Sequence, residues 1–269
     1  MNLTLQLKAA YYSVLRARRP VVVRDNYGIK VRLYPYDKTP IKKVLTRENY
    51  KEEFLLYAQF AHGIVIDVGA HIGVHSVYLS RSASKVYAFE PVASTFELLK
   101  QTIELNHSNN VVPVRAALKD REGMERMNTF PPELSSKNTF GPSVWDAKVI
   151  SEEVPVHTLD GFAKKNRLDY IEFLKIDAEG ADLEVLLGAV ELLKTKKIHV
   201  LCFEVYKKYL ASSNKSAKQI FDFLSSLGYN SYEHNQETGR FEGPIHTSDA
   251  EFENYYASNE DLTRLNLAK

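Results

Sequence analysis

A short stretch near residue 70 carries the residue types that bind a nucleoside. Asp67 ends a β-branched run, Gly69 and Gly73 follow it, and Glu90 ends a second run that is β-branched and aromatic. Glycines let the backbone approach a ligand closely, and a carboxylate at the end of the next strand accepts hydrogen bonds from both ribose hydroxyls. The glycines are spaced Gly-x-x-x-Gly, not Gly-x-Gly-x-x-Gly. This difference weakens the case for a nicotinamide or flavin dinucleotide.

Three further acids lie at or near the ends of apolar runs later in the chain. Asp177 closes one run, Glu179 stands just beyond it, and Glu204 lies near the end of the next. Buried carboxylates are costly unless they are paired or hydrogen-bonded, and the carboxyl ends of parallel strands face one crevice. A single acid at a strand end often only caps the next helix. The joint occurrence with Asp67 therefore favours a common site.

The elements that must position these acids alternate between strands and helices. The two runs that end at Asp67 and Glu90 are joined by a helix after Gly73, which makes a βαβ unit. Val111–Ala117 is the predicted third strand, and its Pro113 suits a sheet edge. Later strands are expected at Val154–Val156, Ile171–Ile176, Ile198–Val205, Tyr229–Glu233 and Phe241–Ile245, and a polar helical tail at Asp249–Arg264. The pattern predicts an α/β fold with an open, mostly parallel sheet.

The residues before this unit are expected to form an N-terminal extension. Residues 1–19 are predicted as a basic, partly amphipathic helix, residues 21–36 as a hairpin, and residues 41–62 as a second helix. The predicted domain boundaries are therefore residues 1–62 for the extension and residues 63–269 for the main domain.

Composition narrows the class of protein. The chain has 269 residues, 44% hydrophobic and 26% charged, which is ordinary for a globular protein. A net charge of +1 gives no general attraction to nucleic acid or to an anionic membrane. Cys202 is the only cysteine, which excludes internal disulfides and multi-thiolate zinc sites. We expect a cytoplasmic protein without a transmembrane segment or signal peptide, and the sequence leaves its oligomeric state open.

Five motifs occur in order and at fitting separations. They read I-D-V-G-A-H-I-G-V-H-S, A-F-E-P, A-A-L-K-D-R-E-G, H-T-L-D and F-L-K-I-D-A-E-G-A-D-L-E-V-L-L-G-A. Over Gly63–Val205 the chain resembles the FkbM family of S-adenosylmethionine-dependent O-methyltransferases. It departs from the family at His71, where Asn is usual, and at Asp182, where Glu is common. The resemblance implies a Rossmann-like class I methyltransferase domain, with a seven-stranded sheet, an antiparallel last strand and helices on both faces.

The resemblance also implies where the cofactor, S-adenosylmethionine, lies. Its methionine end is expected near the first glycine turn, its ribose at the acid after the second strand, and its adenine beyond the third strand. The residues implied as cofactor-binding are Asp67, Gly69, Ala70, His71, Gly73, Glu90, Pro91, Ala116, Ala117 and Asp177.

The expected reaction is direct displacement at the sulfonium methyl by a substrate hydroxyl, frequently on a sugar. An alkyl hydroxyl must lose its proton as the bond forms, so a carboxylate or histidine acts as general base. Asp177 and Glu179 are the leading candidates for this base or for a substrate anchor, followed by Glu204 and His75. A divalent metal bridging Asp177 and Glu204 suits hard oxygen ligands, although no metal-specific spacing is present and no metal site is assigned.

The acceptor class stays open between several readings. The favoured acceptor is a sugar, a glycan or another hydroxylated small metabolite, and no nucleic-acid partner is expected. The alternatives are an RNA ribose methyltransferase and a non-catalytic module that retains the cofactor pocket. The loop over residues 128–146, with Phe130, Phe140 and Trp145, and the tail near Tyr255 and Tyr256 are expected to shape the acceptor pocket.

Overall fold

A computed structural model describes residues 21–25, 27–33 and 51–265. The helix predicted over residues 1–19, and the first part of the helix predicted over residues 41–62, lie outside these residues. The remainder of the second prediction is confirmed, because α3 covers Lys51–Phe60.

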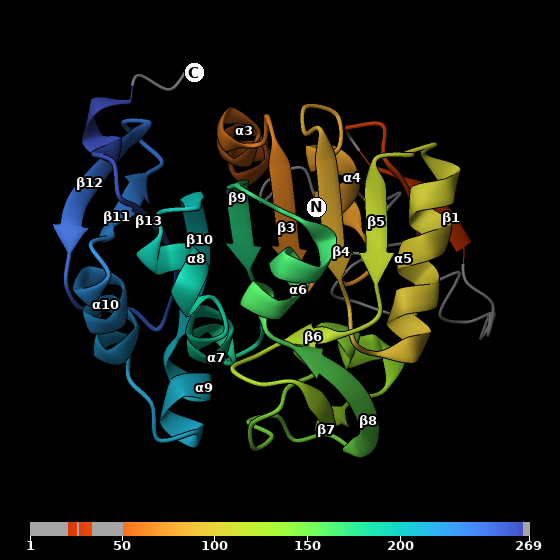
Figure 1. Cartoon of the computed structure of the whole chain (residues 1–269). Coiled ribbons are helices and arrows are strands. Elements are labelled where there is room, and N and C mark those ends of the chain that lie inside the picture. Colours follow the sequence, from red (N-terminus) through yellow and green to blue (C-terminus); the bar gives the residue numbers. More distant parts are fainter. Residues whose placement is uncertain (1–20, 26, 34–50, 266–269) are drawn as a thin grey trace.

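The centre of the molecule is an eight-stranded sheet with the order β12-β11-β13-β10-β9-β3-β4-β5 (Figure 1). Five neighbouring strands are parallel: β5 (Val111–Val114), β4 (Lys85–Phe89), β3 (Ile64–Val68), β9 (Ile171–Ile176) and β10 (Ile198–Tyr206). The other three are β11 (Asn230–Asn235), β12 (Arg240–Ile245) and β13 (Phe252–Ser258). The predicted α/β class is confirmed, and Pro113 lies on the edge strand as expected.

The last strand of the sheet, β13, runs antiparallel to both of its neighbours, β10 and β11. This confirms the predicted antiparallel last strand, and β12 adds one strand beyond the seven expected. The prediction of a helical tail over Asp249–Arg264 is wrong, because this segment forms β13 and the short 3-10 helix η2 (Leu262–Arg264). Hydrogen bonding to a strand on each side, which the local sequence does not reveal, decides its conformation.

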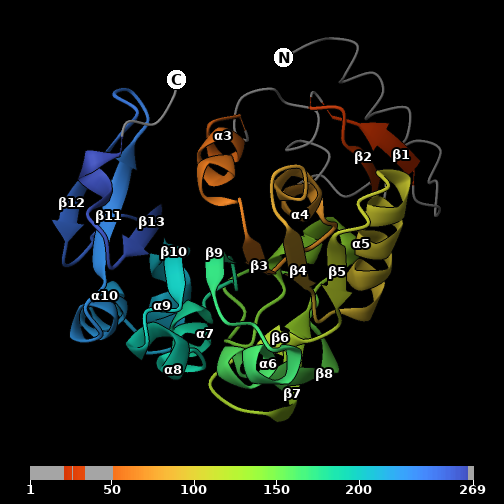
Figure 2. The ribbon, with the colours of Figure 1, turned by 45° about the horizontal axis from the view of Figure 1, so that its top comes forward.

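Helices cover both faces of the sheet (Figure 2). One face packs against α6 (Leu159–Asn166), α7 (Asp182–Leu187), α8 (Val190–Lys194) and α10 (Ala217–Ser226). The opposite face packs against α3, α4 (Val74–Leu79) and α5 (Ala93–Leu105). A capping box formed by Ser216 and Gln219 begins α10. A further short helix, α9 (Lys207–Ser212), follows β10.

The predicted hairpin is confirmed in β1 (Val21–Arg24) and β2 (Lys30–Leu33). It is fastened to α5: the Lys30 amide donates to Asn106 Oδ1 at 2.9 Å, and the Arg32 amide donates to Thr102 Oγ1 at 3.3 Å. Its residues Ile29 and Val31 are buried with residues of α4 and α5. The division into an extension and a main domain remains a prediction.

A second, three-stranded sheet lies beyond the carboxyl ends of the central strands (Figure 1). Its order is β6-β8-β7, formed by Ala117–Leu118, Ile150–His157 and Gly123–Thr129. Between β7 and β8 the chain forms the 3-10 helix η1 (Pro132–Lys137). The sequence indicated a long loop here, and the structure places it over the end of the central sheet where the acids lie.

Candidate active site

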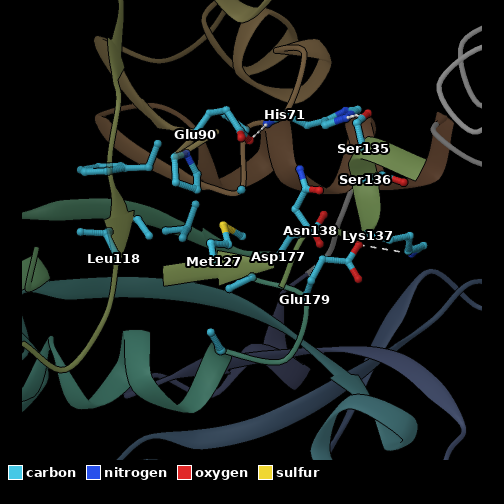
Figure 3. A pocket seen from close by; sticks show the side chains of 18 of the residues that line it. His71, Glu90, Leu118, Met127, Ser135, Ser136, Lys137, Asn138, Asp177 and Glu179 are labelled. Atoms are coloured by element: carbon cyan, nitrogen blue, oxygen red, sulfur yellow. Dashed lines mark hydrogen bonds and ion pairs between the residues drawn. The ribbon is translucent and has the colours of Figure 1, made fainter. Parts of the chain in front are cut away.

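A cavity of about 310 Å³ opens at the carboxyl ends of the parallel strands, beneath η1 and β7. It brings together residues that the sequence places far apart (Figure 3). The predicted site residues that line it are Gly69, Ala70, His71, His75, Glu90, Pro91, Ala116, Ala117, Asp177, Glu179 and Glu204. Two other predicted residues, Asp67 and Gly73, are not among those that line it.

The turn after β3 is shaped by close backbone packing at Gly69. Its φ is +75°, and a Cβ added there would lie 1.9 Å from the carbonyl oxygen of Asp177. The amides of Gly69 and Ala70 both donate to the carbonyl of Phe89, at 3.1 and 2.9 Å. The glycine therefore joins β3, β4 and β9 at one corner of the cavity.

Asp67 has a positioning role in this structure rather than a place in the cavity wall. Its side chain is fully buried, and Oδ2 accepts a hydrogen bond from Ser76 Oγ of α4 at 2.5 Å. Oδ1 lies 3.4 Å from Nζ of Lys175, which is also 3.2 Å from Asp177 Oδ2. Burial alone lowers the pKa of Lys175, but Asp177 and Asp67 outweigh it and raise the pKa above its ordinary value. The charged lysine thus links the ends of β3 and β9.

Gly73 begins α4 with a φ of +89°, and a Cβ there would meet Leu99 Cδ1 at 2.6 Å. It fixes how closely α4 approaches α5. The structure thus shows a packing role for Gly73 at the start of the helix that follows the turn, and its contact with the cofactor stays a prediction.

Glu90 presents its carboxylate at the end of β4. Oε2 accepts a hydrogen bond from the His71 amide at 3.1 Å, and Oε1 accepts one from the Val92 amide at 3.0 Å. Burial raises the pKa of Glu90 to about 8, against the opposing effect of these two amides. A buried carboxyl with acceptor capacity left is suited to a pair of ligand hydroxyls.

Apolar residues form the flank next to Glu90. Ala116 and Ala117 lie there as predicted, and Leu118, Met127 and Phe140 join them in the cavity wall. Figure 3 shows Leu118 and Met127 at the left, away from the charged residues Lys137 and Glu179 at the right. This division gives the cavity an apolar flank fit for a flat heterocycle and a polar end fit for chemistry.

The polar end of the cavity is lined by Asp177, Glu179 and Glu204, and these three acids with the buried Asp182, which does not line the cavity, form what we call the acid corner. Burial raises the pKa of Glu179 to about 7, with Lys137 opposing the shift and Asp177 adding to it. Burial raises the pKa of Asp182 to about 7 as well, although its Oδ1 accepts the Glu204 amide at 3.1 Å. Burial, together with Asp177 and Glu179, raises the pKa of Glu204 well above its ordinary value. Close carboxylates in a buried site titrate as a coupled group, so protons are held here near neutral pH.

The segment that contains η1 is tied to the rest of the cavity by side chains. His71 Nε2 and Ser135 Oγ are 2.8 Å apart, and Lys137 Nζ donates to Glu179 Oε1 at 3.2 Å (Figure 3). Thr139 Oγ1 donates to the Glu179 carbonyl at 2.8 Å, which helps to fix Glu179 at a φ of +47°. This segment therefore closes one side of the cavity and supplies the lysine beside the acid corner.

A model of the methyltransferase FkbM domain matches residues 67–231. The chain belongs to the FkbM methyltransferase family. It is therefore a member of a family of methyltransferases, as its motifs indicate, and the topology of its sheet agrees with the predicted Rossmann-like fold.

Curated relatives share about a quarter of the aligned residues. Methyltransferase sdnD of Sordaria araneosa is 27% identical over 186 residues, which are 56% of this chain and 71% of the relative. Methyltransferase 1 of Beauveria bassiana is 26% identical over 143 residues, or 46% of this chain and 57% of the relative. The hexuronic acid methyltransferase AglP of Haloferax volcanii is 28% identical over 135 residues, or 49% and 52%. The match thus spans little more than half the length of the last two.

Among solved structures, an FkbM methyltransferase from Methylobacillus flagellatus has a TM-score of 0.47 and 15% identity, over 74% of this chain and 44% of that one. SMU.1697c of Streptococcus mutans, in complex with SAH, has a TM-score of 0.44 and 13% identity, over 77% and 94%. At these values neither structure carries an argument about function.

His75, the last of the candidate bases, lines the cavity of this FkbM chain. Its Nε2 is 3.4 Å from Glu53 Oε2 of α3. Within the described part of the chain, no group of three or more His, Cys, Asp or Glu residues is arranged to hold a metal ion. None of the described helices combines the length and hydropathy that crossing a lipid bilayer requires.

The aromatic residues expected at the acceptor end are only partly in place. Phe140 lines the cavity, whereas Phe130 is buried and Trp145 donates to the Tyr209 hydroxyl at 2.9 Å. In the tail near Tyr255 and Tyr256, Phe252 lines the cavity, whereas Tyr255 and Tyr256 themselves are each 3% exposed and lie in the core. They point to opposite faces of β13, and both are buried because side chains of the core cover both faces of the sheet here.

Several lining residues of the FkbM cavity were not singled out from the sequence. Among them are Met127, Ser135, Lys137, Asn138 and Phe252. The unusual composition of residues 128–146 is the one signal that indicated part of this set. Phe252 was indicated only as part of the tail near Tyr255 and Tyr256, because its place in the wall depends on the pairing of β13.

Proposed function

We propose that the chain transfers the methyl group of S-adenosylmethionine to a hydroxyl of a sugar, a glycan or another hydroxylated small metabolite. The observation that carries the proposal is the joint presence, in one cavity, of Glu90 beside an apolar flank and Glu179 in the acid corner. The first arrangement suits a nucleoside, and the second suits removal of a proton from a hydroxyl.

The residues of the Glu90 side fit S-adenosylmethionine in their chemistry. Glu90 would accept the ribose hydroxyls, Ala116, Ala117 and Leu118 would contact adenine, and the turn at Gly69 would receive the methionine end. The absence of a side chain at Gly69 lets β9 approach this turn. When bound, the cofactor supplies an electrophilic methyl group on a positively charged sulfur.

Glu179 is the carboxylate that we propose as general base. A base is most effective when its pKa lies near the working pH, and burial brings the pKa of Glu179 to about 7. Lys137 holds one carboxylate oxygen in place at 3.2 Å. Asp177, whose Oδ2 is 3.2 Å from Lys175, is better suited to anchoring the substrate or the amino group of the cofactor.

The step balances without any further reactant. The acceptor hydroxyl gives its proton to Glu179 as its oxygen forms a bond to the methyl carbon. The carbon–sulfur bond breaks, and its electron pair stays on sulfur, which becomes neutral. Holding the two reactants in line removes much of the entropy of encounter, so alignment within the cavity contributes strongly to the rate.

The acid corner favours a hydroxyl over a carboxylate as the acceptor. Four acids lie close together there. In addition to burial, Asp177 and Glu179 both raise the pKa of Asp182 and the pKa of Glu204. A carboxylate acceptor would add another negative charge to this group and needs no general base. A neutral hydroxyl needs the base and avoids the repulsion.

Transfer of a labelled methyl group tests this proposal. The purified chain is incubated with labelled S-adenosylmethionine and a panel of glycosides, alkyl alcohols, uronic acids and transfer RNA. We expect label in a glycoside or alcohol, in a form stable to mild alkali, because methyl ethers survive and methyl esters hydrolyse. Alkali-labile label on a uronic acid, or label confined to RNA, contradicts the proposed acceptor.

A further inference from the structure

The rim of the cavity where β10 ends and β13 begins has a defined pattern of side chains. In the antiparallel register, Glu204 pairs with Asn254 and Tyr206 pairs with Phe252. Directly paired residues, and residues two positions apart on a strand, share one face of a sheet. The four side chains therefore lie on the same face, which we call the rim face. Glu204 and Phe252 both line the cavity, so the rim face continues its wall.

The opposite face of these strands is committed to the core. Phe203 packs against Tyr255, with ring centroids 5.9 Å apart, and both contact Phe221 of α10. This packing fixes the alternation of both strands, because a slip by one residue would turn the buried aromatics to the rim. The position of Phe252 on the rim is thus set by the core beneath it.

Phe252 differs from the other aromatic residues of β13 in its exposure. It is 53% exposed, whereas Tyr255 and Tyr256 are each 3% exposed. One edge is supported by Tyr206, whose ring centroid is 5.8 Å away at an interplanar angle of 79°. Tyr206 in turn contacts Tyr209 at 5.0 Å. A supported, exposed ring beside a polar cavity offers a ligand a firm apolar surface.

The chemistry of the rim face matches a sugar ring. A pyranose presents C–H groups with a small positive charge, which pack on the negative face of an aromatic ring. Its hydroxyls both donate and accept, and they match the amide of Asn254 and the carboxylate of Glu204. A nucleotide base could also stack, but its phosphate would approach the four acids of the acid corner.

We propose that the rim face binds a neutral pyranose ring of the methyl acceptor, stacked on Phe252 with its hydroxyls toward Asn254 and Glu204. The inference rests on the proposed function and adds the surface that selects the acceptor. It places the ring next to Glu179, since Glu179 and Glu204 line the same cavity. Phe252 is then a specificity residue that takes no part in the proton transfer.

Methyl transfer to simple glycosides tests the rim face through KM. The acceptors are methyl β-D-glucopyranoside, methyl β-D-galactopyranoside and methyl α-D-mannopyranoside. For whichever of these glycosides accepts the methyl group, we expect Phe252→Ala to raise the KM about tenfold. This is the equivalent of losing one stacking contact. The KM for S-adenosylmethionine should not change, and Phe252→Tyr should retain the wild-type KM. The matched control is Tyr170→Ala, because Tyr170 is also an exposed aromatic, at 43%, and lies outside the cavity.

A binding measurement separates this inference from the proposed function. Saturation-transfer NMR of the same glycosides, with S-adenosylhomocysteine present, should show contact with the wild type and lose it in Phe252→Ala. The proposal that the rim face binds the sugar is wrong if the wild type shows no contact with the glycosides, or if the two proteins show equal contact. Methyl transfer to a glycoside with an unchanged KM in Phe252→Ala also overturns it while the proposed function stands. Contact without methyl transfer leaves the rim face in place and contradicts the proposed function.

Discussion

The hydrogen bonds that hold Glu90 in one wall of the cavity come from residues close to it in the chain, whereas those around Glu179 in the other wall join distant segments. Glu90 accepts a hydrogen bond from the amide of His71, which lies 19 positions earlier in the same βαβ unit. Lys137 and Glu179 are 42 positions apart, and His71 and Ser135 are 64 apart. The first wall is held largely by backbone groups and the second by side chains.

The largest effect is expected from the Glu90 wall, at Gly69→Ala. The new Cβ would lie 1.9 Å from the Asp177 carbonyl, so β3 and β9 must separate. We expect the affinity for S-adenosylhomocysteine, measured by calorimetry, to fall at least about a hundredfold, or the fold to be lost. Gly28→Ala is the control, because Gly28 has a similar φ of +78° and nothing within 4 Å of its Cβ position. It should cost only about 1 kcal/mol of backbone strain. Equal losses of binding in both variants would remove the steric argument.

In the Glu179 wall, Glu179→Gln removes the proposed base without changing its shape. We expect kcat to fall at least roughly a hundredfold while the affinity for S-adenosylhomocysteine is kept. Glu184→Gln is a matched control, because Glu184 also pairs with a lysine, Lys215, and does not line the cavity. A kcat for Glu179→Gln within threefold of wild type would shift the role of base to Asp177, Glu204 or His75.

Glu90→Gln is expected to affect binding and stability in opposite directions. Glutamine leaves only one acceptor oxygen for the two ribose hydroxyls, so S-adenosylhomocysteine binding should weaken by roughly tenfold. The pKa of Glu90 is raised to about 8 in the folded protein, so the folded state binds its proton more tightly than the unfolded state. That stabilisation is complete below the ordinary pKa of 4.5 and is lost as the pH rises through about 8. Relative to wild type, the variant should gain thermal stability between pH 5 and pH 9. Glu97→Gln, an exposed change on α5, should show no such trend.

The smallest effect is expected at Lys137→Met, which sharpens the role of the lysine beside Glu179. Lys137 lowers the pKa of Glu179, so its removal should raise that pKa above about 7. The rise of kcat/KM with pH should then shift upward by about one unit, with roughly tenfold less activity at pH 6 and near-equal activity at pH 9. Lys100→Met, on the surface of α5, is the control. An unshifted pH profile would mean that Lys137 only fastens the segment that contains η1.

The sequence alone determined the part of the site whose geometry is local. Two β-branched runs, the glycines between them and Glu90 predict a βαβ corner, because the tight turn after the first run needs a positive φ that glycine adopts without strain. The runs ending at Asp177 and near Glu204 gave two more strand ends, since a parallel sheet collects its carboxyl ends at one edge. The first glycine motif predicted His71 as a site residue, but nothing in the sequence indicated its contact with Ser135.

Only the tertiary structure decided which residues meet across the acceptor end. Lys137 reaches Glu179 because the segment with η1 folds back over the sheet, and Phe252 reaches the rim because β13 inserts between β10 and β11. The local sequence of residues 249–264 suited a polar helix, and pairing with two strands overrode that preference. Asp67 likewise does not line the cavity. Its fully buried carboxylate needs polar partners and finds them in Lys175 and Ser76. Contacts of this kind depend on the packing of the whole sheet, which residue types and spacing do not record.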